Sequence, residues 1–470
     1  MRVFVIPCWL ALAASGVLDA SGETIRLRTG DVIYADEVKE NSTTVEYQVG
    51  DNSYTIPKSK VQSIEASPKN DAPSHVVMPV PAFTPETQVS GEQNLMGQVV
   101  RNHDVDRGAL ASMESRNNPE EIAVAYYIAA KSEFEAGKYP DSRHDFETAL
   151  RFQPDNPAIL TYYAALLVRT GSALDAISYA KRATRIVPDS ADALGVLGYA
   201  EFSAGRMRDA IESWQKSLAL RPDGTIQQLL ARAERELAAE SNYSERETGH
   251  FILRFEGSQS SDGFREQLLA TLESQYQDLA HTFGSEPHSA IQVVLYTSQS
   301  FFDVTRAPAW IGALNDGKLR IPLHGLDSVT SDLARVLRHE LTHSFVNQMT
   351  AGRCPAWLNE GVAQLLEPRS LGGRAAQLAQ LFKAEREIPL NMLEGGFASF
   401  GATEAALAYD ESLAAAGYLY GHYGMPDLVR VLQRIGQGES AESSLRSVLH
   451  SDYGRLEEEL RTNLAGQVGN

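Results

Sequence analysis

The most informative stretch of this chain is His339-Glu340-Leu341-Thr342-His343. On a helix, residues four apart lie one turn apart on the same face, so His339 and His343 can reach one metal ion. Glu340 lies about 100° round the helix and can lean over the same site to take a proton from a metal-activated water. Glu360 follows seventeen residues after His343, and a second helix carrying it would complete a His₂Glu set with one open position. The stretch therefore predicts one zinc ion per chain and a hydrolytic site.

The residues around this stretch place it on a helix. Apolar side chains recur there at helical spacing: Leu333, Val336, Leu337, Leu341 and Phe345. The alternative is that both histidines lie on the surface of an ordinary amphipathic helix, because a five-residue match of this kind arises by chance in roughly a few per cent of chains of this size. The helical pattern and the independent match around Glu360 favour the metal site.

The composition is that of a soluble globular protein. The chain has 470 residues, of which 43% are hydrophobic and 22% charged, a length typical of about three domains. The formal net charge of −19 argues against nucleic acid or an anionic membrane surface as the main partner, because both require a basic patch. We therefore expect a protein or peptide substrate and no nucleic acid.

Residues 1–20 have the pattern of a secretory signal peptide. A short positive start is followed by a mostly apolar run and by small residues before a cleavage position near Ala20. An uncleaved anchor is the alternative, although the run is shorter than the ~20 residues of a membrane-spanning helix. After cleavage Cys354 would be the single cysteine, so no internal disulfide could form. We expect a periplasmic or secreted bacterial protein with no stable membrane insertion after cleavage.

Two segments of different character follow the signal peptide. Residues 21–66 alternate apolar and polar side chains in four or five short runs separated by turn residues, which predicts a small β module. The pattern resembles SH3-like or Sm-like small barrels, and its role is either structural or that of a peptide-docking module. Residues 67–117 are polar and contain five prolines, which predicts a flexible linker.

Residues 118–242 contain a repeat with a period of 34 residues. Three series show it: Gly137, Gly171 and Gly205; Asp141, Asp175 and Asp209; Pro154, Pro188 and Pro222. The period resembles tetratricopeptide repeats, all-α solenoids of helical hairpins that must stack to bury their apolar faces. Residues 225–240 are expected to form the capping helix. The repeats would bind a protein partner in their groove or, with equal weight, act as a rigid spacer that places the catalytic domain.

Residues 243–470 are expected to form one α+β domain. Besides the motif helix, this part contains the segment Cys354-Pro355-Ala356-Trp357-Leu358-Asn359-Glu360-Gly361-Val362-Ala363 and a strand that runs from Asp316 to Pro322. These features resemble the gluzincin metallopeptidases, most closely the peptidase-MA-like domains of bacterial exported proteins. The resemblance implies a zincin-like fold, with a mixed sheet over the active-site helix and a helical lower half, and zinc-dependent peptide hydrolysis. An edge strand over 318–323 could pair with an extended substrate.

The resemblance also implies roles for single residues. His339, His343 and Glu360 match the zinc ligands, and Glu340 matches the general base. Tyr409 is our candidate for an additional oxyanion donor, with a core or surface tyrosine as the alternative.

Two departures from the family pattern bear on the chemistry. Gln364 stands where thermolysin-like enzymes have an aspartate, and its amide would hold an imidazole N–H more weakly than a carboxylate. Residues 312–315 lack the glutamate with which gluzincin aminopeptidases bind a substrate amine, and this absence favours an endopeptidase.

The leading hypothesis is thus an exported zinc endopeptidase that hydrolyses peptide bonds with a Glu-assisted, zinc-activated water, with repeats that bind substrate or partner. The rival hypothesis is an envelope scaffold for protein interactions whose zincin domain is structural or idle, because a metal can be retained for stability alone.

Overall fold

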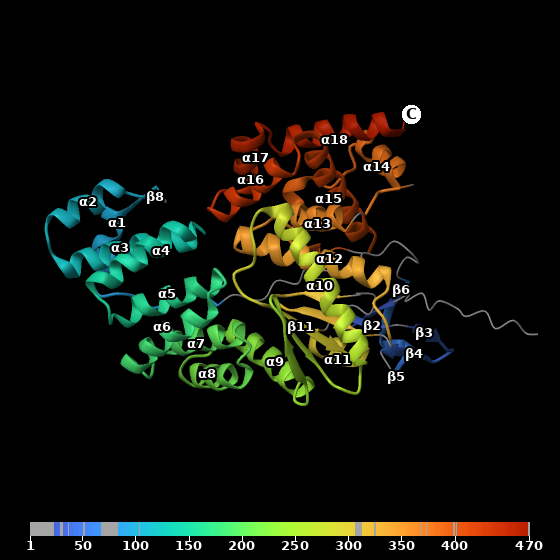
Figure 1. Ribbon diagram of the computed structural model, residues 1–470, viewed down its shortest axis with the longest axis horizontal. Coiled ribbons are helices and arrows are strands. Elements are labelled where there is room, and N and C mark those ends of the chain that lie inside the picture. The colour runs from blue at the N-terminus through green and yellow to red at the C-terminus, as the bar shows by residue number, and fades with distance from the viewer. Residues whose placement is uncertain are drawn as a thin grey trace, which may run out of the picture. The chain divides into compact units, whose positions relative to one another are not determined.

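A computed structural model of the protein describes residues 23–28, 32–35, 37–49, 52–66, 83–102, 104–305, 313–323, 326–367, 369–372, 374–397, 400 and 402–468. The described residues form two compact units, one before residue 73 and one after it (Figure 1). The expected signal peptide, residues 1–20, lies outside the described residues. In the part that is described, no helix is both long and apolar enough to span a bilayer.

The N-terminal unit contains two small sheets. Strands β1 (Glu23–Leu27), β2 (Val32–Ala35) and β6 (Val61–Ala66) form one sheet in the order β2-β1-β6, and β3 (Glu37–Glu40), β4 (Thr44–Val49) and β5 (Asn52–Pro57) form the other. The prediction of a barrel-like module is wrong in this respect. Among the described residues no pairing joins β2 to β3 or β5 to β6, since a 3₁₀ turn (Lys58–Lys60) follows β5, so the sheets do not close.

The stretch predicted to be a linker is partly helical. It contains α1 (Glu92–Val99), a two-stranded pair β7 (Val100–Arg101) and β8 (Asp104–Val105), and α2 (Arg107–Ser115). Arg107 fixes α2 to the first repeat hairpin by pairing with Asp145 (2.7 Å) and with Glu133. The linker prediction therefore does not hold for residues 92–115, which cap the start of the solenoid.

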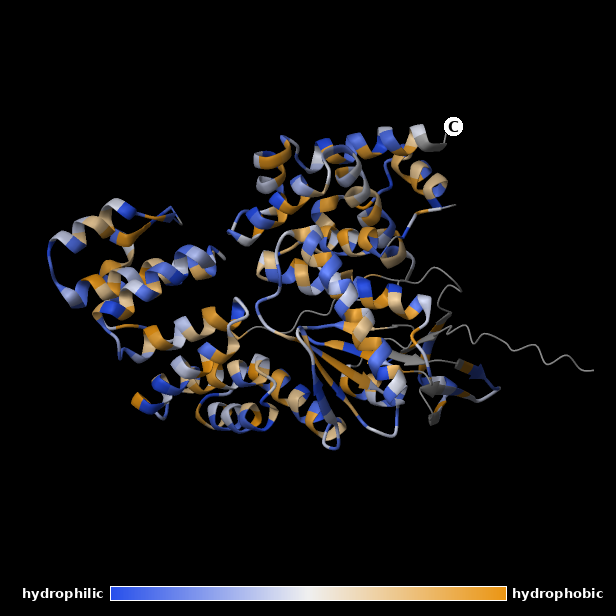
Figure 2. Ribbon diagram, in the orientation of Figure 1, coloured by the Kyte–Doolittle hydropathy of each residue, from blue (hydrophilic) through white to orange (hydrophobic). Residues whose placement is uncertain are grey.

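Three helical hairpins and an end helix follow, where the 34-residue period predicts them. They are α3 (Pro119–Glu135), α4 (Tyr139–Phe152), α5 (Pro157–Arg169), α6 (Ala173–Ile186), α7 (Ala191–Ser203), α8 (Met207–Leu220) and the capping helix α9 (Gly224–Ala239). Hydrophobic and hydrophilic residues alternate along them in Figure 2, as packed amphipathic helices require. The small residues at the crossings leave no spare room, because a Cβ added to Gly198 would lie 2.5 Å from Trp214.

The C-terminal part is built on a five-stranded mixed sheet in the order β12-β13-β11-β10-β9. The strands are β9 (Ser244–Glu247), β10 (Phe251–Phe255), β11 (Ile291–Tyr296), β12 (Leu314–Asn315) and β13 (Leu319–Pro322). Strands β10, β11 and β13 are parallel, and β9 and β12 are antiparallel edge strands. The prediction that 318–323 is an edge strand is therefore wrong, because β13 pairs on both sides and the edge is β12.

Helices make up the rest of this part. They are α10 (Asp262–Phe283), α11 (Ser298–Thr305), α12 (Ser331–Thr350), α13 (Ala356–Leu366), α14 (Arg374–Lys383), α15 (Ala402–Tyr423), α16 (Met425–Gly436), α17 (Ala441–Leu449) and α18 (Tyr453–Val468), with a 3₁₀ turn at Leu390–Leu393. One apolar core joins the sheet to α10, α12, α13 and the C-terminal helices. The motif helix α12 thus runs through the centre of the domain.

The turns inside the three hairpins contact the sheet-containing domain. Each turn holds a glycine with positive φ, and a side chain of that domain lies where a Cβ would project. The pairs are Gly137 with Arg353, Gly171 with Gln348, and Gly205 with Gln292. Arg353 also donates a hydrogen bond to the Gly137 carbonyl (2.8 Å).

The end helix α9 is held to the sheet by buried charges. We call this group the interface network; its members are Arg232, Glu236, Glu240, Tyr296, Asp316, Lys318 and Arg320. At its centre Arg320 is completely buried and donates to Glu236 (2.6 Å), Asp316 (2.9 Å) and the Tyr296 hydroxyl (2.7 Å). Lys318 also donates to Glu236 (2.7 Å). The repeats are therefore an integral part of this unit.

Candidate metal centre

Two helices carry the candidate ligands. Helix α12 begins after Thr330, whose hydroxyl accepts the Leu333 N–H (3.1 Å), and brings His339, Glu340 and His343 into the buried interior. Helix α13 carries Glu360 and packs closely against α15, because position 361 is glycine: a Cβ there would lie 2.3 Å from the Ser412 carbonyl oxygen. The glycine after the ligand therefore allows the approach that sets the position of Glu360.

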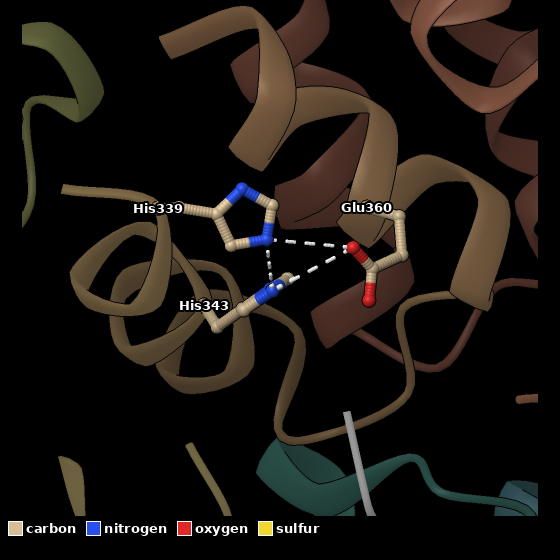
Figure 3. Close-up of side chains that lie close together, drawn as sticks. All are labelled: His339, His343 and Glu360. Atoms are coloured by element: carbon tan, nitrogen blue, oxygen red, sulfur yellow. Dashed lines mark hydrogen bonds and ion pairs between the residues drawn. The ribbon is translucent and has the colours of Figure 1, made fainter. Parts of the chain in front are cut away.

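The side chains of His339, His343 and Glu360 point to one position (Figure 3). The two Nε2 atoms are 3.0 Å apart, and Glu360 Oε2 lies 3.5 Å from Nε2 of His339 and 3.8 Å from Nε2 of His343. Elsewhere in the part of the chain that the structure describes, no other group of three or more His, Cys, Asp or Glu side chains is spaced to hold a metal ion. The structure thus brings together the three residues that the sequence predicted as ligands.

Hydrogen bonds on the far side of each imidazole fix its orientation. Nδ1 of His339 donates to Glu367 Oε2 (2.6 Å), and Nδ1 of His343 donates to Asn359 Oδ1 (2.9 Å). Each ring therefore carries its proton on Nδ1 and presents the Nε2 lone pair to the shared position, as metal-ligating histidines do. Arg335 holds Glu367 in turn (2.5 Å).

Gln364 does not take the role that sequence reasoning gave it. Its amide nitrogen donates to the Tyr409 carbonyl (2.9 Å), whereas Glu367 is the carboxylate that holds an imidazole. Sequence reasoning missed Glu367. The available signal was its spacing: Glu367 stands seven residues after Glu360, which on a helix is about two turns further along the same face.

The electrostatics of the site suit a cation. Burial lowers the pKa of His343 to about 4 and, together with His343, lowers that of His339 well below its usual value, so both rings are neutral. Two facing Nε2 lone pairs repel each other unless a positive ion lies between them. Burial, followed by the charge of Glu360, raises the pKa of Glu340 well above its usual value. The chemistry of this donor set, two neutral imidazoles and a carboxylate, fits zinc.

Glu340 stands next to the ligand His339 on α12 with one side-chain oxygen unsatisfied. Its Oε1 atom is buried and has no hydrogen-bond partner among the described residues. A buried polar atom without a partner costs about 1–3 kcal/mol, so its retention in a native interior points to a use.

Tyr409 and Asn315 also border the site. Tyr409 on α15 is buried, and burial followed by the charges of Glu360 and Glu340 raises the pKa of its hydroxyl, which places the phenol within the field of both carboxylates. Asn315 on β12 donates to the Glu340 carbonyl (2.7 Å) and to Ser344 Oγ (2.7 Å). The edge strand is therefore tied to the motif helix, a link that sequence reasoning missed.

Comparison with known proteins assigns both parts of the larger unit. Residues 272–466 match the family model of the Peptidase MA superfamily, and residues 127–191 and 175–225 match that of the tetratricopeptide repeat. The prediction of a peptidase-MA-like domain preceded by tetratricopeptide repeats is thereby confirmed.

Similar single proteins cover about a quarter to a third of this chain. The chain is 29% identical over 126 residues to the small glutamine-rich tetratricopeptide repeat-containing protein 2 of Mycosarcoma maydis, which is 26% of this chain and 36% of that protein's length. It is similar to the first TPR domain of human RPAP3 (21% identity, 27% of this chain and 98% of that one, TM-score 0.26). It is also similar to MamA from Desulfovibrio magneticus RS-1 (20% identity, 30% and 81%, TM-score 0.26). Likeness at this level says nothing about what this chain binds.

Proposed function

We propose that this chain is an exported zinc-dependent endopeptidase whose repeats bind substrate or a protein partner. One observation carries the proposal: two neutral imidazoles and a carboxylate point to one buried position, next to a glutamate whose Oε1 atom has no partner among the described residues. The Peptidase MA superfamily match over residues 272–466 supports it.

His339, His343 and Glu360 would hold the ion, one per chain. When bound, zinc would supply a Lewis acid that lowers the pKa of the attacking water and polarises the peptide carbonyl. Glu340 would accept a proton from that water and return it to the leaving amine, because its buried Oε1 atom has no partner among the described residues and is available for proton transfer. Glu367 and Asn359 keep both imidazoles in the tautomer that this chemistry requires.

Two further residues would act on the substrate. Tyr409 would donate from its hydroxyl to the oxygen of the tetrahedral intermediate, because it lies in the field of both site carboxylates. Strand β12, an edge strand of the sheet among the described residues and bonded to α12 through Asn315, would pair with an extended substrate. Backbone pairing of this kind accepts the middle of a polypeptide and therefore suits an endopeptidase.

Zinc analysis of purified protein tests the site. We expect about one zinc per chain in the wild type, and loss of most of it in Glu360→Ala, because two imidazoles alone make an incomplete set. Glu458→Ala is the matched control, since that carboxylate is 72% exposed and lies on α18, which carries none of the candidate ligands. Wild-type protein that takes up no zinc, even after unfolding and refolding with zinc present, would contradict the proposed peptidase.

A further inference from the structure

An extended segment, Phe83–Val89, lies along one face of the repeat solenoid; we call it the strap. The strap contains neither helix nor strand. It contacts the first helix of each hairpin in turn, α3 at Tyr127, α5 at Tyr162 and α7 at Gly195. We call the surface that these helices form with α9 the first-helix face. Part of the stretch predicted as a linker thus occupies the surface on which a partner was expected.

The first-helix face binds the backbone of the strap. Three hydrogen bonds do so: the Tyr162 hydroxyl donates to the Pro85 carbonyl (2.6 Å), the Tyr127 hydroxyl donates to the Thr87 carbonyl (2.9 Å), and the Glu86 N–H donates to Asp192 Oδ2 (3.2 Å). Every peptide offers carbonyls, and nearly every residue offers an N–H, so these contacts hold an extended chain without selecting its sequence.

Two side chains of the strap add selectivity. Phe83 is only 2% exposed and fills the space above Gly195, where a Cβ would lie 2.9 Å from the ring and 2.9 Å from Ile226. Glu86, three residues further on, lies 3.5 Å from Arg221 and remains 77% exposed. The face therefore provides a closed position for an aromatic ring and a weaker, solvent-exposed position for a carboxylate.

We propose that the first-helix face is a peptide-binding site whose resident ligand is the strap, and that a partner binds by displacing it with an extended segment of the same chemistry. That segment has an aromatic residue followed three residues later by a carboxylate. The proposal rests on the partner-binding half of the proposed function and is independent of the zinc chemistry.

The contacts of the strap would allow a partner segment to displace it. A tethered ligand acts at an effective concentration of about millimolar, so it excludes weak external peptides and yields to a partner that makes more contacts. The strap is held by three buried side chains, Phe83, Pro85 and Val89, and by three backbone hydrogen bonds. Each hydrogen bond replaces one to water, so its net contribution is only about 0.5–1.5 kcal/mol. Phe83 and Val89 belong to the solenoid core, but most of that core comes from the helices themselves. Weakening the aromatic anchor should therefore free the strap while the helices keep the larger part of their packing.

Binding of a labelled peptide to the full-length protein tests this. The probe is a fluorescent peptide with the sequence of residues 81–91, and all proteins carry Glu340→Gln so that the probe is not cleaved. We expect Phe83→Ala to bind the probe at least tenfold more tightly than the protein with an intact strap, by fluorescence anisotropy. A probe with alanine at the position of Phe83 should not bind to the Phe83→Ala protein. The Phe83→Ala, Tyr162→Phe double variant should bind the original probe more weakly than Phe83→Ala alone, because it lacks one hydrogen bond to the peptide backbone.

A second variant guards against misfolding of the first. Glu86→Arg places a like charge beside Arg221 on an exposed side chain, so it should weaken the strap and leave the fold intact. This variant should also bind the probe more tightly than the parent, although by a smaller factor than Phe83→Ala. If both variants melt near the wild-type temperature yet bind the probe no better than the parent, the strap is a permanent part of the solenoid and the proposal is wrong. Equal binding of the alanine probe would overturn it too. Neither result depends on zinc content, so failure here is distinct from failure of the peptidase proposal.

Discussion

Two buried polar clusters lie side by side in the larger unit, and they are built in opposite ways. In the interface network three basic side chains, Arg232, Lys318 and Arg320, meet three acidic ones, Glu236, Glu240 and Asp316. In the candidate metal centre two neutral imidazoles and the Glu360 carboxylate converge on one position. The clusters are neighbours in the chain, since Asn315 bonds to the motif helix and Asp316 to Arg320.

The difference separates a cluster that is complete from one that requires something more. Burying charge is costly unless each charge has its partner, and the network meets that condition within the chain itself. The metal centre leaves facing lone pairs and the unpartnered Glu340 Oε1, a donor set that an added cation and a water would complete. We therefore expect substitutions in the first cluster to affect stability and those in the second to affect metal binding or catalysis.

The largest expected effect is on catalysis. Glu340→Gln keeps the shape of the side chain but removes the proposed base, so hydrolysis of a fluorescent casein substrate should fall by about 10²–10⁴-fold. Zinc content and melting temperature should stay at wild-type values, because Glu340 is not a ligand. Cleavage at the wild-type rate would instead show that activity in the preparation does not come from this site.

Breaking the complete cluster should act on stability. Arg320→Met leaves Glu236 and Asp316 buried without their central partner, and we expect a loss of about 3–5 kcal/mol in the free energy of unfolding measured with urea. Arg430→Met is the control, because Arg430 is 61% exposed and its pair with Asp427 should contribute less than about 1 kcal/mol. Similar losses in the two variants would mean that the network adds no more than a surface pair.

Tyr409→Phe tests the oxyanion role. Loss of one donor to the developing charge should lower kcat by about 10²–10³-fold with KM nearly unchanged, because the hydroxyl would act in the transition state. Zinc content should remain at one per chain. Unchanged turnover would remove Tyr409 from the catalytic set and leave it as a core residue of α15.

Glu367→Gln should have a smaller effect at the same site. An amide holds the His339 N–H more weakly than a carboxylate, so zinc affinity should fall by about 10–100-fold while the ligands themselves remain. Competition with a chelator measures this. Gln364→Ala serves as a comparison, because the Gln364 amide donates to the Glu360 and Tyr409 carbonyls and not to an imidazole, so its loss should change affinity less. A larger loss of affinity in Gln364→Ala than in Glu367→Gln would contradict the role of Glu367.

The smallest expected effect is a pH dependence of the interface network. Burial alone would raise the pKa of Glu236, but the charges of Arg320, Lys318 and Arg232 outweigh it and hold the pKa below its usual value. A lowered carboxylate pKa contributes stability that is present above about pH 4.5 and is lost as the pH falls.

The test compares urea unfolding of the wild type and of Glu236→Gln between pH 7 and pH 3. The difference in unfolding free energy between the two proteins should narrow by about 1–2 kcal/mol toward acid pH. The reason is that Glu236 takes up a proton in the unfolded state at a higher pH than in the folded state, which favours unfolding of the wild type. Parallel curves would show that Glu236 keeps its pairing without any linkage to protons.

The sequence predicted the features that repeat or that pack closely along the chain. The 34-residue series placed all three hairpins, and the spacing of His339, His343 and Glu360 predicted three side chains that the fold brings together. The helical positions of the first two follow from local geometry alone, and the third from a motif at a typical distance.

What the sequence did not predict depends on contacts between distant segments. Asn315 and the interface network acquire their partners only when the domain folds, and no local pattern marks them. The strap was predicted as part of a linker, because a seven-residue extended segment within a polar, proline-containing stretch gives no helical or strand pattern long enough to identify it. The β module was predicted as a barrel because alternation identifies strands but not which of them pair.

The glycine turns of the hairpins have a consequence for how this protein could change in length. A solenoid that is anchored at one end can gain or lose whole repeats, since each contacts only its neighbours. Here each turn contacts a different side chain of the sheet-containing domain, Arg353, Gln348 or Gln292, and α9 is bonded to the sheet after the last hairpin. Insertion or deletion of 34 residues would misplace every turn after it, so the number of repeats is set by the domain against which they lie.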